Sequence, residues 1–186
     1  MRKNIVKIIF IIFFYQALTI GLSTAEEEHH RQGFWGGIDV GVGLLEQSLD
    51  NSTKDDTNFY LGFKGGYTLN PNFLIGVELS GWLLEAADVN DPRYGEGVSQ
   101  ILAIARYYPL QTSNLFLKAG AGYVRMWNNR PGEPSGMEGG AFAFGVGYDF
   151  LITDKIALSP FASYYLGNPG DIDYRAITFG IGITFH

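Results

Sequence analysis

Six charged side chains are spaced through apolar and glycine-rich segments in which charge is otherwise rare. They are three acids and three bases: Asp39, Lys64, Glu78, Arg106, Lys118 and Asp149. In an enclosed space such residues could line a path for ions. They could equally neutralise one another in a salt-bridge network, because a buried charge is tolerated only when it is paired. The equal numbers of the two signs suit a balanced network, and an ion path is the alternative.

Nucleophilic catalysis has one weak candidate. Ser163 lies in the segment FASYYLGNPG (161–170), but a serine needs a general base beside it to act as a nucleophile. The three histidines of the chain are His29 and His30 near the start and His186 at the end, so none lies near Ser163 in the sequence. We therefore predict that the protein is not an enzyme, and we expect no cofactor and no metal.

The segments that carry the six charges alternate with a period of two, which predicts β-strands. The clearest is AITFGIGITFH (176–186), in which large apolar residues occupy every second position from Ile177 to Phe185. Threonine or glycine fills the positions between them, whereas a soluble sheet would normally carry charged groups on its outer face. Large residues toward hydrocarbon and small ones toward a narrow lumen are typical of a transmembrane β-barrel.

The same alternation recurs along the chain and predicts eight strands. Their expected ranges are 34–44, 59–69, 73–84, 98–108, 115–127, 141–150, 155–166 and 176–186. The six charges then point inward, and a hairpin turning at 70–72 places Lys64 opposite Glu78, where we expect an ion pair. Pro160 lacks a ladder donor and predicts a bulge or local distortion. The alternation leaves the faces of the fourth and seventh strands open, apart from Arg106, which is costly toward lipid.

The connections between these strands alternate between long and short. Polar loops are expected at 46–58, 85–97, 128–136 and 167–173, and short turns at 70–72, 109–114 and 153–154. Outer-membrane barrels have short periplasmic turns and longer extracellular loops. Side chains fill the interior of an eight-stranded barrel, which favours the salt-bridge network over the ion path.

The start of the chain predicts export. Basic residues precede an apolar run that ends in Ser23-Thr24-Ala25, so we expect a cleaved signal peptide at 1–25, a mobile periplasmic leader at 26–32 and a barrel domain at 33–186. Without the signal peptide, 13 − 3 = 10 basic residues face 19 acidic ones, a formal charge of −9. That charge argues against a nucleic-acid partner. The chain has no cysteine, so hydrogen bonds and burial must hold it together.

The strand rhythm, segments such as LFLKAGAGYVR (115–125) and the closing strand resemble the small eight-stranded outer-membrane β-barrel proteins of the OmpA transmembrane-domain, OmpX or Ail kind. The resemblance covers residues 33 to 186. It implies an all-β fold, an eight-stranded antiparallel up-and-down transmembrane β-barrel in the bacterial outer membrane. It also implies that the barrel-assembly machinery recognises an aromatic residue ending the last strand, here Phe185.

The resemblance further implies a monomer with a structural or surface-interaction role. Membrane integrity, adhesion or contact with a host or surface ligand would then depend on the extracellular loops. A narrow porin-like channel for small solutes or ions is the alternative. A soluble periplasmic barrel with a ligand cavity is disfavoured, because most of the expected outer faces are bulky and apolar.

Acidic residues dominate the first two expected loops. They include Glu46, Asp50, Asp55, Asp56, Asp88 and Asp91, and they outnumber Lys54 and Arg93. Ordinary solvated charge would explain them. The sharper hypothesis is that they bind divalent cations bridging the phosphates of lipopolysaccharide, since calcium and magnesium prefer oxygen ligands.

Overall fold

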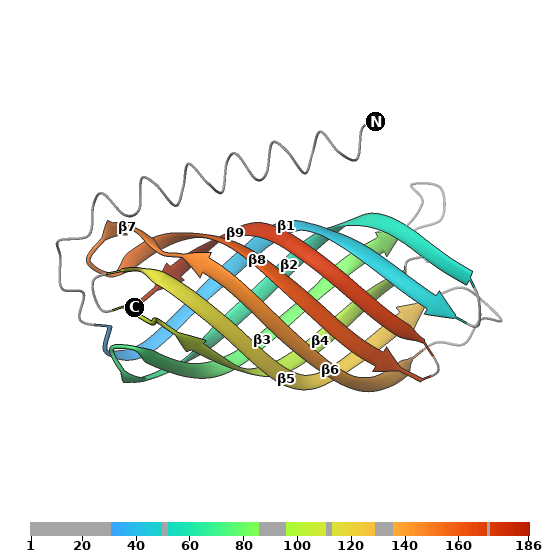
Figure 1. Ribbon diagram of the computed structural model, residues 1–186, viewed down its shortest axis with the longest axis horizontal. Coiled ribbons are helices and arrows are strands. Elements are labelled where there is room, and N and C mark those ends of the chain that lie inside the picture. Colours follow the sequence, from blue (N-terminus) through green and yellow to red (C-terminus); the bar gives the residue numbers. More distant parts are fainter. Residues whose placement is uncertain (1–30, 50–51, 86–95, 111–112, 129–135, 171) are drawn as a thin grey trace.

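The computed structural model describes residues 31–49, 52–85, 96–110, 113–128, 136–170 and 172–186, which form one closed antiparallel barrel (Figure 1). Its strands are β1 (Gly33–Leu49), β2 (Ser52–Asn70), β3 (Phe73–Glu85), β4 (Glu96–Tyr107), β5 (Leu115–Asn128), β6 (Met137–Tyr148), β7 (Phe150–Thr153), β8 (Ile156–Pro169) and β9 (Asp173–Phe185). The predicted signal peptide lies outside the described residues. Within the described part of the chain, no helix is long and apolar enough to cross a membrane.

The barrel closes because the sheet has no open side. The strands from β1 to β6 pair in sequence order, β8 pairs with β7 and β9, β1 pairs with β9, and β6 pairs with β8. β6 and β7 are two pieces of a single barrel strand, since both pair with β8 in one continuous register: Gly147 lies opposite Phe161, and Phe150 lies opposite Leu158. The prediction of an eight-stranded antiparallel barrel is therefore confirmed.

The distortion expected at Pro160 is an interrupted ladder. β8 runs past Pro160 without a register shift on the β9 side, where Pro160 lies opposite Ile181. On the other side, pairing with β6 stops at Phe161 and pairing with β7 resumes at Leu158. Proline has no N–H to donate, so the break between β6 and β7 falls beside it. Asp149 occupies that break.

The predicted loop at 46–58 is wrong. β1 continues to Leu49 and β2 begins at Ser52, and the two strands stay paired up to that point. The predicted loop at 167–173 is shorter for the same reason, since β8 reaches Pro169 and β9 begins at Asp173. Polar residues mark where a strand leaves hydrocarbon, but the ladder can continue into water because its backbone bonds do not depend on lipid.

The two faces of the wall divide as expected. Outward residues such as Ile38 and Val40 are about half exposed, at 48% and 47%, while Asp39 between them is 2% exposed. The structure also settles the two faces that the sequence left open. β4 turns Leu102, Ile104 and Arg106 inward, and β8 turns inward the buried residues Ala157, Ser159, Phe161, Ser163 and Tyr165.

Small inward residues are needed where adjacent strands approach closely and where large side chains fill the lumen. At Gly66 on β2, an added Cβ would lie 1.9 Å from the carbonyl oxygen of Ile75 on β3. No side chain fits there, so the position requires glycine.

Candidate functional site

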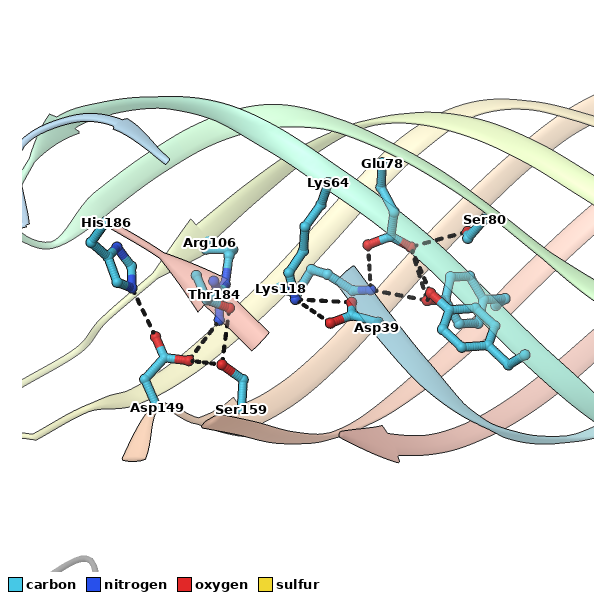
Figure 2. A network of polar contacts seen from close by, with 12 residues as sticks. Asp39, Lys64, Glu78, Ser80, Arg106, Lys118, Asp149, Ser159, Thr184 and His186 are labelled. Carbon is cyan, nitrogen blue, oxygen red and sulfur yellow. Dashed lines mark hydrogen bonds and ion pairs between the residues drawn. The ribbon is translucent and has the colours of Figure 1, made fainter. Parts of the chain in front are cut away.

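The predicted site residues meet in the lumen that the barrel wall encloses. All six predicted charges face it from β1 to β5 and from the break between β6 and β7, and Figure 2 shows them in two groups. Their side chains are almost completely buried: Asp39, Lys64, Glu78, Arg106, Lys118 and Asp149.

The first group, in the middle of the barrel, contains two ion pairs. The Lys64 Nζ donates to both oxygens of Asp39, at 2.6 and 2.9 Å. The Lys118 Nζ donates to Glu78 Oε2 at 2.8 Å. We call these four residues the central network.

The predicted ion pair between Lys64 and Glu78 is therefore wrong, although the register behind it is right. The two residues are direct partners in the ladder of β2 and β3. Lys64 instead reaches a diagonal position on β1, and Glu78 takes a lysine from β5, which is not a neighbour of β3. Hairpin geometry considers only adjacent strands, whereas long side chains can reach across a narrow lumen.

Neutral donors complete the coordination of the Glu78 carboxylate. The Tyr165 hydroxyl donates to Oε1 at 2.9 Å and accepts from the Lys118 Nζ at 3.0 Å. Ser80 also donates to Oε1, at 3.2 Å, and the hydroxyls of Tyr60 and Tyr165 lie 3.0 Å apart. Charge-assisted bonds of this kind offset the cost of burying a carboxylate.

Polar contacts continue from the central network toward the end of the barrel at which β3 and β5 end, which we call the loop end. Gln100 donates to Ser80 at 2.9 Å and accepts from the Tyr174 hydroxyl at 2.8 Å. The indole of Trp82 donates to Thr178 at 3.0 Å. The sequence placed Trp82 inward, but it gave no sign of the contact between Gln100 and Tyr174, which joins strands that are not neighbours.

The second group surrounds Asp149 near the other end of the barrel, which we call the turn end. This end carries the turns at 71–72 and 154–155. Asp149 accepts from Arg106 at 3.1 Å, from the Tyr108 hydroxyl at 2.6 Å and from Ser159 at 2.6 Å. The Nε2 atom of His186 lies 3.5 Å from Oδ2 of Asp149. We call these five residues the Asp149 cluster.

Two further features hold the Asp149 cluster in place. The guanidinium carbon of Arg106 lies 3.6 Å from the ring centroid of Phe116, a cation–π contact. Tyr108 follows the end of β4, and burial raises the pKa of its hydroxyl, which therefore stays protonated and donates to Asp149. The sequence indicated Asp149 and Arg106 but not His186, whose side chain is 6% exposed.

The remaining predicted residues lie outside the two groups. Ser163 is buried in the lumen, and its partners in register are Gly145 and Thr178, neither of which is a base. In the part of the chain that the structure describes, no three residues among histidine, cysteine, aspartate and glutamate are grouped so that they could hold a metal ion. Phe185 ends β9 on the outer face, 49% exposed.

Only some of the predicted loop carboxylates can be placed. Asp50, Asp88 and Asp91 lie outside the described residues. Asp55 and Asp56 lie within strand β2. Glu46 is exposed near the loop end of β1, where its partners in register are Asp55 on β2 and Arg175 on β9.

Solved structures with this barrel geometry are known. Neisserial surface protein A is 19% identical, with a TM-score of 0.58 over 82% of this chain and 96% of that one. Ail, the attachment invasion locus protein of Yersinia pestis, crystallised with the heparin analogue sucrose octasulfate, is 16% identical, with a TM-score of 0.54 over 83% of this chain and 99% of that one. At these identities the similarity shows the fold. No curated protein sequence matches the chain significantly.

A family model matches almost the whole chain. The model is that of the outer membrane protein beta-barrel domain, and it covers residues 16–185. The match agrees with the closed barrel, the apolar outer face and the filled lumen. The chain therefore belongs to the outer membrane protein beta-barrel domain family.

Proposed function

We propose that this outer-membrane barrel has a structural or surface-interaction role, in membrane integrity, adhesion or host contact, carried by the parts that extend beyond the membrane. The observation that supports this role is the filled lumen. Glu78, Tyr60 and Tyr165 in the central region and Arg106 in the Asp149 cluster all have 0% exposure. A wall around such an interior offers no path for solutes, so interactions with other molecules are left to the outer surface and the loops.

Conductance in planar lipid bilayers tests this proposal against the narrow channel. We expect the purified mature protein to give no stable single-channel current, because ion passage would require breaking both ion pairs of the central network. A stable current that disappears in Lys64→Ala and in Glu78→Gln would contradict the filled lumen and establish the channel.

We further propose that acidic residues at the loop end bind divalent cations that bridge lipopolysaccharide phosphates. Glu46 and Asp55 are direct partners in register, and like charges in that arrangement are destabilising unless they are compensated. On the β9 side, the partner of Glu46 in register is Arg175, whose positive charge could compensate one of the two acids. A divalent cation such as calcium or magnesium, which prefers oxygen ligands, would compensate the remaining negative charge. The same acidity does not suit a sulfated polyanion such as the one bound to Ail, so we do not extend that ligand to this chain.

Neutralising the first hairpin tests the cation proposal. In cells that produce the variant Glu46→Gln/Asp50→Asn/Asp55→Asn/Asp56→Asn, we expect greater detergent sensitivity at limiting magnesium and no difference once a chelator has removed the cations. Asp154→Asn, an exposed aspartate at the turn end, is the matched control and should behave as the parent. Unchanged sensitivity of the fourfold variant would refute cation bridging.

The route to the membrane is part of the same proposal. A signal peptide at 1–25 would direct export, and the barrel-assembly machinery would recognise Phe185 at the end of β9. The mature protein would act as a monomer, because the pairings of β1 with β9 and of β6 with β8 leave no long strand edge in the described barrel with which to recruit a second copy.

A further inference from the structure

The two residues before β1 do not continue the barrel wall. Arg31 is 5% exposed, and its guanidinium donates to the Asn114 side-chain oxygen at 2.5 Å. The same guanidinium lies 3.7 Å from the ring centroid of Tyr108. The Arg31 guanidinium is thus held at its edge by the hydrogen bond to Asn114 and at its planar face by the cation–π contact with Tyr108.

These contacts lie on the side of the barrel opposite β1. Tyr108 follows β4 and Asn114 precedes β5, and these strands are the third and fourth neighbours of β1 in the order of the sheet. In a closed barrel of eight strands the fourth neighbour is diametrically opposite. Arg31 therefore reaches across the opening at the turn end.

The far side of this opening is itself tied together. Tyr108 donates its backbone N–H to the carbonyl of Asn72 at 2.9 Å, and the Asn72 side chain donates back to the carbonyl of Tyr108 at 2.7 Å. The turn between β2 and β3 is thus bonded to the segment that follows β4. Arg31 packs against an anchored ring, so its contacts do not depend on a loose turn.

The chain bends into the opening at Gly33. This residue has a φ of +78°, a backbone conformation that residues other than glycine rarely adopt. A Cβ added there would meet no atom within 4 Å. Glycine is therefore needed for the backbone bend and not for space.

Tyr108 connects Arg31 to the Asp149 cluster, because its ring contacts Arg31 and its hydroxyl donates to Asp149. Four nitrogens of that cluster are buried without a hydrogen-bond partner: Nε and Nη1 of Arg106 and both ring nitrogens of His186. Buried polar atoms of this kind are normally satisfied by ordered water.

We propose that Arg31–Gly33 forms a strap, hinged at Gly33, that closes the turn end of the lumen over a hydrated compartment containing Arg106, Asp149 and His186. The strap separates this compartment from the solvent at the turn end. Arg31 and Gln32 precede β1 and add no ladder bonds, so the strap can open without unfolding the barrel. The filled central network then remains the second barrier.

Thiol accessibility tests the strap, because the chain has no cysteine of its own. Ser159→Cys places a single thiol in the compartment at a position that is 0% exposed. The purified mature protein in detergent micelles is treated with a cationic and, separately, an anionic methanethiosulfonate reagent. We expect slow modification in the Ser159→Cys parent. Adding Arg31→Ala should accelerate both reagents about tenfold, the factor that corresponds to about 1.4 kcal/mol of lost strap contacts.

Two matched controls separate opening from other effects. Arg175→Ala removes an exposed arginine at the loop end and should leave both rates unchanged. Gly33→Ala should accelerate both reagents, because it strains only the hinge, whereas Gly140→Ala, which also meets no atom within 4 Å and lacks the positive φ, should not. If Ser159→Cys fails to fold, as judged by its mobility before and after heating, Thr184→Cys replaces it, since Thr184 is also buried and hydrogen-bonded to Ser159.

The two reagents distinguish the opening of the strap from a simple change of charge. Loss of a positive charge without opening would accelerate the cationic reagent and slow the anionic one. That pattern, or equal rates with and without Arg31, would overturn the proposal. A parent thiol that already reacts as fast as an exposed one would also overturn it.

Discussion

Glu78 and Lys118 show what a single residue contributes to this barrel. Their side chains are only 0% and 6% exposed, so the pair is almost completely removed from solvent. Removing charges from water is expensive, and a buried pair often stabilises no more than apolar residues of the same size would. Breaking the pair is different, because the remaining charge stays buried alone. The pair therefore constrains the sequence more strongly than it stabilises the fold.

We predict that Lys118→Met lowers the free energy of unfolding by about 3–5 kcal/mol, because it leaves the Glu78 carboxylate without its cation. The double variant Glu78→Gln/Lys118→Met should recover most of this loss. Urea unfolding in lipid vesicles, followed by tryptophan fluorescence, measures both.

The pair of Arg125 and Glu138 is the matched control for this prediction. It lies on the outer surface, with side chains 58% and 46% exposed. Exposed pairs contribute about 0–1 kcal/mol, so Arg125→Met should have a small effect. A loss in Lys118→Met no larger than that in Arg125→Met would show that the central network is not buried as the structure has it.

A second prediction at the residue scale concerns two glycines that look alike in the sequence. Gly66→Ala places a Cβ 1.9 Å from a backbone oxygen of the adjacent strand, and a ladder cannot move apart locally, so we expect a loss of at least about 1–3 kcal/mol, the usual cost of overpacking. Gly140→Ala meets open space and should be neutral or stabilise by up to about 1 kcal/mol. The same urea titration compares them, and equal effects would contradict the close approach of β2 and β3.

At the scale of the strand, the sequence predicts the features that depend on a contrast between apolar and small or polar residues. It misses strand faces, strand ends and side-chain contacts that do not depend on this contrast. Alternation of large apolar and small residues located every strand that crosses hydrocarbon. It could not orient β8, because residues of similar size occupy both faces, such as Tyr164 outside and Tyr165 inside. It also ended β1 too early, at the point where polarity begins, although its ladder with β2 continues to Leu49. The ion-pair partners were missed because side chains reach diagonally, as Lys64 does to Asp39 on β1, or across the lumen, as Lys118 does to Glu78.

The end of β9 gives a prediction at the same scale. We expect Phe185→Ala to reduce the amount of folded protein in the outer membrane, while Phe185→Tyr restores it, because the proposed assembly signal needs an aromatic ring. Ile183→Ala is the control, since Ile183 lies on the same outer face and is similarly exposed, 46% against 49%. Quantifying the folded band in membrane fractions tests this. Equal losses in Phe185→Ala and Ile183→Ala would indicate that lost apolar surface alone is responsible.

For the whole molecule, closure is the property on which the other features depend. The pairings of β1 with β9 and of β6 with β8 remove both edges of the sheet. Every barrel strand then satisfies its backbone groups from two sides, which is the condition for exposing a β-structure to hydrocarbon. Closure also sets the width of the lumen, and that width brings Lys118 within reach of Glu78 and Arg31 within reach of Tyr108. With no disulfide in the chain, these ladders and the packed lumen carry the stability.

Closure predicts how the intact protein behaves in detergent. A closed ladder has no free strand from which unfolding can begin, so the barrel should resist sodium dodecyl sulfate until it is heated, and unheated and boiled outer-membrane fractions should migrate differently on a denaturing gel. Ending the chain after Ile172 removes β9 and leaves β1 and β8 as edges, so this variant should show no difference. Replacing residues 47–56 by Asn-Gly shortens only the extended hairpin and should keep the difference. A protein that migrates equally before and after boiling, and that fractionates with soluble periplasmic proteins, would mean that the apolar face is packed in a core and that the lumen must be reconsidered as a ligand cavity.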